Sequence, residues 1–100
     1  MSENGFSARP DGTFEICGRM TFHTVPALLA KTAHWLNDTS GAVTIDLSKV
    51  QWADSAGLAL MIEWLHQARV VGRELRFINF PEQIKHMIGV SGLADAFGIA

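Results

Sequence analysis

Three strand-like segments alternate with three helix-like segments along this chain, and no other feature constrains the fold as strongly. Apolar and polar side chains alternate, or β-branched residues gather, in residues 13–17, 42–47 and 74–80. Apolar residues recur at three- and four-residue spacing in residues 24–36, 54–71 and 81 to about 91. Strands separated by helices require βαβ crossovers and some parallel pairing. We expect an α/β fold with a mixed sheet, because the first two strands are close enough to form a hairpin.

The length of 100 residues predicts a single domain with one core. We expect residues 1–11 to form a flexible lead-in and residues 12–100 to form the domain. Charged residues make up only 18% of the chain, against about 25% in a typical soluble domain. Either a partner covers part of the surface or the domain is simply apolar, and composition does not separate these alternatives.

Several classes of function lack their sequence signals. The net charge is −2 and no basic run is present, so the sequence does not indicate the basic surface that binds nucleic acids. None of the four histidines pairs with a cysteine or another histidine at metal-ligand spacing, and we interpret Glu63-x-x-His66 as a solvent-facing side of a helix. Ser55 has no evident base, and a G-x-x-x-x-G-K phosphate loop is absent. We therefore predict a protein that is not an enzyme and has no metal and no cofactor.

The helix expected from residue 55 to about 71 carries two apolar stripes. The expected core face holds Leu58, Met61, Ile62, Leu65 and Ala68. A second stripe, about 120° away on a helical wheel, holds Leu60, Trp64 and Val71. Such a helix is either buried on two sides or covered by a partner. Burial on two sides is harder in a domain of this size, so we expect the second stripe to bind a partner.

The start of this helix adds to the predicted docking surface. Asp54 and Ser55 are both favourable N-cap residues, and the N–H groups of the first helical turn point toward them. Ala56 and Gly57 are small, which would let another chain approach closely. Plain capping explains Asp54 and Ser55, but it does not explain two small residues followed by a broadly apolar helix. We predict a partner-binding surface made of Asp54, Ser55, Ala56, Gly57, Leu58, Leu60 and Trp64.

In the order and spacing of its motifs, the chain resembles the STAS family. The resemblance covers about residues 12–99 and rests on residues 43–48, Val50, residues 54–58, residues 72–75 and residues 91–93. It implies a mixed sheet of four to five strands with about three to four helices packed mainly on one face. Its best-known members are anti-sigma-factor antagonists, in which the residue matching Ser55 is phosphorylated by a partner kinase. The resemblance thus implies Ser55 as a phosphorylation site if this chain has that function.

A narrower resemblance points to another partner. Residues 18–22, 24–29, 57–60 and 63–65 are similar to the STAS subunit (MlaB-like) of the Mla phospholipid-transport ABC system of Gram-negative bacteria. That subunit binds the cytoplasmic ATPase subunit and supports its assembly, and the complex maintains outer-membrane lipid asymmetry. Such subunits often carry Thr where this chain has Ser55. The resemblance implies a non-catalytic accessory subunit, with an anti-sigma-factor antagonist as the alternative.

The longest strongly apolar stretch, residues 56–65, is broken by Glu63 and is too short to span a bilayer. Any membrane association would therefore depend on another chain. Together with the resemblance, this predicts a cytoplasmic protein that lies at the periphery of the inner membrane through its partner.

Overall fold

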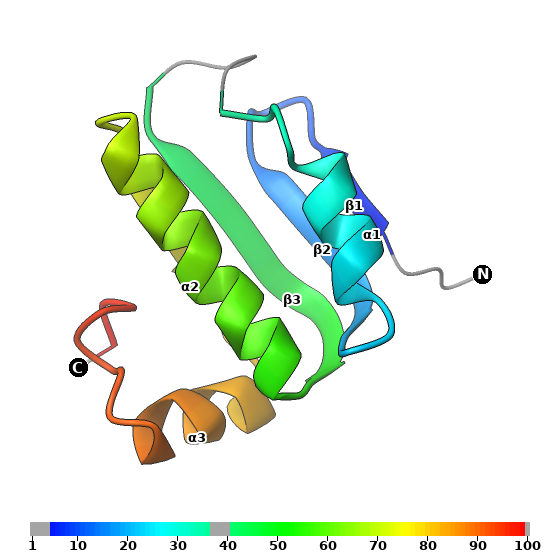
Figure 1. Ribbon diagram of the computed structural model, residues 1–100, viewed down its shortest axis with the longest axis vertical. Helices are drawn as coiled ribbons and strands as arrows, with labels where there is room; N and C mark the ends of the chain where they lie inside the picture. Colours follow the sequence, from blue (N-terminus) through cyan, green and yellow to red (C-terminus); the bar gives the residue numbers. More distant parts are fainter. Residues whose placement is uncertain (1–4, 37–40, 100) are drawn as a thin grey trace.

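A four-stranded mixed sheet forms the centre of the computed structural model, which describes residues 5–36 and 41–99 (Figure 1). The strands lie in the order β1-β2-β3-β4. They span Gly5–Ala8, Phe14–Met20, Val43–Ala53 and Leu75–Ile78. β1 is antiparallel to β2, whereas the β2–β3 and β3–β4 pairs are parallel. The predicted mixed α/β sheet with helices is confirmed. The hairpin expected of the first two predicted strands is wrong, because residues 13–17 and 42–47 correspond to β2 and β3, which are parallel, and the antiparallel pair is β1 and β2.

In the described part of the chain, three helices connect and flank the strands. They are α1 (Val25–Lys31), α2 (Ser55–Val70) and α3 (Glu82–Val90). Figure 1 shows α1 and α2 lying side by side over one face of the sheet, with α1 over β1 and β2 and α2 along β3. α1 ends five residues earlier than its apolar spacing predicts. The residues after it form turns that still bury Thr32 and Trp35 against the core.

The strand β1 corrects the expectation of a flexible lead-in over residues 1–11. Its four residues pair with β2 in a register that runs from Gly5 opposite Cys17 to Ala8 opposite Phe14. Phe6 stacks on Phe14 with ring centroids 5.1 Å apart and meets the edge of Trp35 at 5.4 Å. This aromatic packing stabilises a segment whose own composition carries no strand pattern. Residues 1–4 of the predicted lead-in lie outside the described part of the chain.

The end of β3 is tied to α3 by one side chain. The amide of Gln83 donates from Nε2 to the carbonyl of Ala53 at 2.8 Å, and its Oε1 accepts from the Ala53 N–H at 3.0 Å. Gln83 thereby satisfies both backbone groups of the last residue of β3, as a neighbouring strand would. The contact holds α3 beside the point at which the chain enters α2, as Figure 1 shows.

The sheet face opposite the helices is polar. Asp46 in β3 accepts hydrogen bonds from Arg9, from the Ser48 N–H and from the side chain of Asn79, at 2.8, 2.8 and 3.1 Å. Asn79 adopts a left-handed backbone conformation with φ of 59°, which asparagine tolerates better than most residues. Burial alone would raise the pKa of Asp46, but these hydrogen bonds lower it to about 2. Asp46 is therefore charged near neutral pH and joins Arg9, Ser48 and Asn79 by hydrogen bonds on this face.

Candidate functional site

Asp54 joins the start of α2 to the turn that follows β2. Its Oδ1 accepts from the N–H groups of Ala56 and Gly57, at 2.9 and 3.2 Å, as an N-cap residue does. Its Oδ2 accepts from the Phe22 N–H at 3.0 Å. The bond from Phe22 is the main reason why the pKa of Asp54 lies below its usual value, and the bonds from Gly57 and Ala56 add to it. Of the two predicted capping residues, Asp54 is the cap, and Ser55 is left exposed in the first turn.

Gly57 is small for a reason internal to the domain. It is buried, and a Cβ at this position would overlap the carbonyl oxygen of Met20 at the end of β2. The same end of β2 receives the Asp54 N–H, which donates to the Met20 carbonyl at 3.1 Å. Glycine at this position therefore lets the first turn of α2 pack directly against the end of β2. The expectation that Gly57 makes room for a partner is wrong, because β2 already occupies that space.

The second apolar stripe of α2 is part of the core, which corrects a further expectation. Leu60 and Trp64 are 3% and 0% exposed, so neither side chain is available to a partner. Trp64 packs near Phe6, Trp35 and Phe77, with ring centroids 5.5 to 6.4 Å apart. Its Nε1 also donates to the hydroxyl of Thr32, just after α1, at 3.0 Å. The sheet buries one side of α2. Another side of α2 is buried by α1 and the turns that follow it, which accounts for the broad apolar arc of α2.

Leu58 is also buried, at 7% exposure, as its place on the predicted core face requires. It therefore offers no side-chain contact to a partner. Val71, the third member of the second stripe, is 50% exposed. Ile62, expected in the core, is 40% exposed instead.

A different side of α2 is open to solvent. Ser55, Ala59, Ile62, His66 and Arg69 are all exposed and follow one another at spacings of four, three, four and three residues. Residues at such spacing share one face of a helix. We call these five residues the exposed stripe of α2. The stripe begins at Ser55, which belongs to the predicted docking surface, and its other four residues were not part of that prediction.

Two exposed aromatic residues near Asp54 were not among the residues predicted from the sequence. Phe22 is 73% exposed and belongs to the turn whose backbone Asp54 holds. Trp52 is 45% exposed and lies two residues before Asp54, opposite Arg19 of β2. Phe22 sits in a turn, where no periodicity reveals exposure. Strand alternation would place Trp52 on the same face as the buried Val50, but the β2–β3 register shifts there, because the neighbours Gly18 and Arg19 lie opposite Val50 and Trp52.

No group of three or more His, Cys, Asp or Glu side chains within residues 5–36 and 41–99 is arranged to hold a metal ion. Cys17 is a free thiol, half-buried in β2. No helix in the described ranges is both long enough and apolar enough to cross a membrane.

Comparison with solved structures supports the architecture. The unphosphorylated form of the anti-sigma factor antagonist SpoIIAA superposes with a TM-score of 0.66 at 14% identity, covering 87% of this chain and 82% of that one. A crystal structure of Mglu superposes with a TM-score of 0.62 at 19% identity, covering 79% of this chain but only 20% of that longer chain. At these identities the likeness concerns the fold alone.

Comparison by sequence identifies the family. No curated protein sequence matches the chain significantly. The family model described as "Mlab, STAS domain" matches residues 7–99, which is nearly the whole chain and all of the strands and helices except the beginning of β1. The family expected from the motifs at residues 43–48 and 54–58 is thus confirmed, and the chain belongs to the Mlab-type STAS domains.

Proposed function

We propose that this protein is a non-catalytic accessory subunit that binds and supports the cytoplasmic ATPase of an ABC transporter for phospholipids. The observation that carries the proposal is the match of the Mlab-type STAS model over residues 7–99. STAS domains of this kind are binding proteins, so their function depends on an exposed surface. In this proposal the protein has no cofactor of its own, any nucleotide belongs to the ATPase, and the complex places the protein at the cytoplasmic side of the inner membrane.

The docking surface that we propose is the corner around Asp54. It consists of Phe22, Asp54, Ser55 and Ala56 together with the exposed stripe of α2. Asp54 holds both the Phe22 backbone and the first turn of α2, so these parts keep a fixed relative position. Aromatic residues, Phe included, are enriched at the centres of protein interfaces, and a few buried anchor residues carry most of the binding energy. Phe22 would therefore be the apolar anchor, and Ser55 would lie at close contact beside it.

Two variants test this surface against the purified ATPase subunit of the phospholipid-transport system from the same organism. Phe22→Ala should weaken binding about thirtyfold if Phe22 is an anchor. Ser55→Glu should weaken it at least about tenfold, because it puts a charge into a close contact beside Asp54. Both residues are exposed, so thermal unfolding should change little.

Matched controls lie elsewhere on the surface. Val90→Ala removes a side chain that is 71% exposed at the end of α3, nearly the same exposure as Phe22. Ser7→Glu makes the same chemical change as Ser55→Glu on the edge strand β1. Both controls should bind like the original protein. If the original protein does not bind the ATPase subunit, the proposed function is wrong. If Phe22→Ala and Ser55→Glu bind normally, the proposed surface is wrong.

The alternative function is that of an anti-sigma-factor antagonist controlled by phosphorylation at Ser55. It is favoured by the likeness of the fold to SpoIIAA and by the exposure of Ser55 in the first turn of α2. The Asp54 carboxylate already accepts the N–H groups of Ala56 and Gly57. A phosphate on Ser55 would add about −1.5 to −2 charges next to that carboxylate, so repulsion would dominate its effect on a docked partner.

Incubation with ATP and a cognate anti-sigma kinase separates the two functions. The alternative requires a phosphoryl group on Ser55, read by mass spectrometry, and none on a Ser55→Ala control. An unmodified Ser55 after incubation with the kinase excludes the alternative and leaves the ATPase as the partner.

A further inference from the structure

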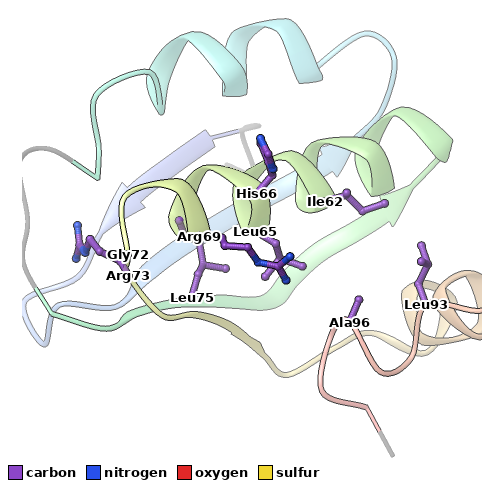
Figure 2. A pocket seen from close by; sticks show the side chains of 10 residues that line it. Ile62, Leu65, His66, Arg69, Gly72, Arg73, Leu75, Leu93 and Ala96 are labelled. Carbon is purple, nitrogen blue, oxygen red and sulfur yellow. The ribbon is translucent and has the colours of Figure 1, made fainter.

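An open groove runs along α2 at the end far from Ser55. It has a volume of about 620 Å³ and lies between α2 and the segment after α3. Its apolar lining includes Ile62 and Leu65 of α2 and, across from them, Leu93 and Ala96, while His66 and Arg69 add polar groups. Figure 2 shows these residues projecting from the helix and from the C-terminal segment that faces it.

Arg69 gives this groove a positive charge that no acidic side chain within residues 5–36 and 41–99 pairs with. Within the described part of the chain, Arg9, Lys49, Arg76 and Lys85 take part in ion pairs, and Arg73 donates to the carbonyls of Leu36 and Gly41. Arg69 is exposed and forms no ion pair with any described residue. Its guanidinium therefore remains available to an acidic group from outside.

The groove is continuous with the docking corner. Ile62, His66 and Arg69 line the groove and also belong to the exposed stripe that begins at Ser55. At a rise of 1.5 Å per residue, the distance from Ser55 to Arg69 along the helix is about 21 Å. A specific interface buries about 800 Å² on each partner, which is more than one corner with a single aromatic residue supplies. A partner at the corner gains the missing area most directly along this stripe.

We propose that the groove receives an amphipathic helix of the same ATPase subunit, with apolar residues against Ile62, Leu65 and Leu93 and a carboxylate paired with Arg69. This inference rests on the proposed function and extends its surface. A partner helix of about 14 residues would reach from Ser55 to Arg69. Apolar anchors at three- and four-residue spacing are how helices occupy grooves of this kind. The complementary charge would set the direction in which the helix lies.

The test uses the whole protein and the purified ATPase subunit, with affinity and association rate measured at about 50 and 300 mM salt. Arg69→Glu should weaken binding at least about tenfold, chiefly through slower association, and should remove most of the salt dependence. Ala96→Trp, at an exposed position, should fill the groove and weaken binding at both salt concentrations. Lys31→Glu is the matched control, because it makes the same change of charge on α1, away from the groove, and should bind normally.

The outcomes separate this inference from the proposed function. If Ser55→Glu weakens binding while Arg69→Glu or Ala96→Trp binds like the original protein, the groove is not part of the interface and the accessory function stands. If the original protein does not bind the ATPase subunit, both proposals are overturned. Circular dichroism and thermal unfolding of each variant show that any loss of binding is not a loss of folding.

Discussion

The indole Nε1 of Trp64 lies 3.0 Å from the hydroxyl oxygen of Thr32, and both side chains are buried. The Thr32 hydroxyl in turn donates to the Leu28 carbonyl at 2.9 Å, so it accepts from Trp64 while donating to α1. The bond joins α2 to the end of α1 through the interior. It also satisfies the polar atom of a tryptophan that would otherwise be costly to bury.

Replacing Thr32 by valine should therefore lower the free energy of unfolding by about 1–3 kcal/mol, because it leaves Trp64 Nε1 buried without its acceptor. Trp64→Ala should cost about 3–5 kcal/mol through the cavity that it creates. Urea unfolding followed by far-ultraviolet circular dichroism measures both. Thr44→Val, on the open face of β3, is the control and should change stability by less than about 0.5 kcal/mol. A Thr32→Val protein as stable as the original would contradict the role of this bond.

Two glycines offer a matched pair of substitutions. Gly57→Ala should destabilise the protein by at least about 2 kcal/mol, because the added Cβ meets the backbone oxygen of Met20, which cannot move aside alone. Gly89→Ala, in α3, has no atom within 4 Å of the new Cβ and should stabilise the protein by about 0.5–1 kcal/mol. Thermal and urea unfolding give both values. Equal changes in the free energy of unfolding at the two positions would show that the first turn of α2 does not pack closely against the end of β2.

Asp46 should control the acid stability of the protein. Its folded pKa of about 2 lies below the ordinary value of 3.8, so the charged carboxylate stabilises the fold above about pH 4. This contribution, about 2 kcal/mol, should be lost as the pH falls from about 4 to 2. Asp46→Asn should be less stable than the original near neutral pH and should lack this part of the acid transition. Urea unfolding of both proteins at a series of pH values tests this prediction. Asp95→Asn, at an exposed site, is the control and should keep the acid transition of the original protein.

Asp54 should hold the start of α2 and the turn at Phe22, the proposed docking corner, in place. Asp54→Ala should lower the free energy of unfolding by about 0.5–2 kcal/mol, as the loss of an N-cap residue does. Asp54→Asn should cost less, because asparagine also accepts from first-turn N–H groups. Hydrogen exchange should quicken at the Phe22, Ala56 and Gly57 amides in Asp54→Ala and change little in Asp54→Asn. Unchanged exchange at Phe22 in Asp54→Ala would show that the turn does not depend on this carboxylate.

Much of the fold follows from local patterns in the chain. The strand at residues 42–47, the helix from Ser55 and its start at Asp54 are visible in the sequence, because strand alternation and capping depend on neighbouring residues. The edge strand β1 is not visible in this way. Its four residues become a strand because Phe6 reaches Phe14 and Trp35, and Trp35 lies far along the chain.

The contrast between local sequence patterns and long-range contacts is clearest at the proposed docking surface. The amino-acid pattern alone shows that α2 is apolar over a broad arc and that Asp54 and Ser55 stand at its start. A helical wheel cannot distinguish a partner from another element of the same chain, since both cover apolar side chains. The packing of the folded chain is what shows that α1 and the turns after it cover Leu60 and Trp64, and that the stripe from Ser55 to Arg69 faces solvent. Burial cannot be read from one helix alone, because it depends on which other segments of the chain pack against that helix.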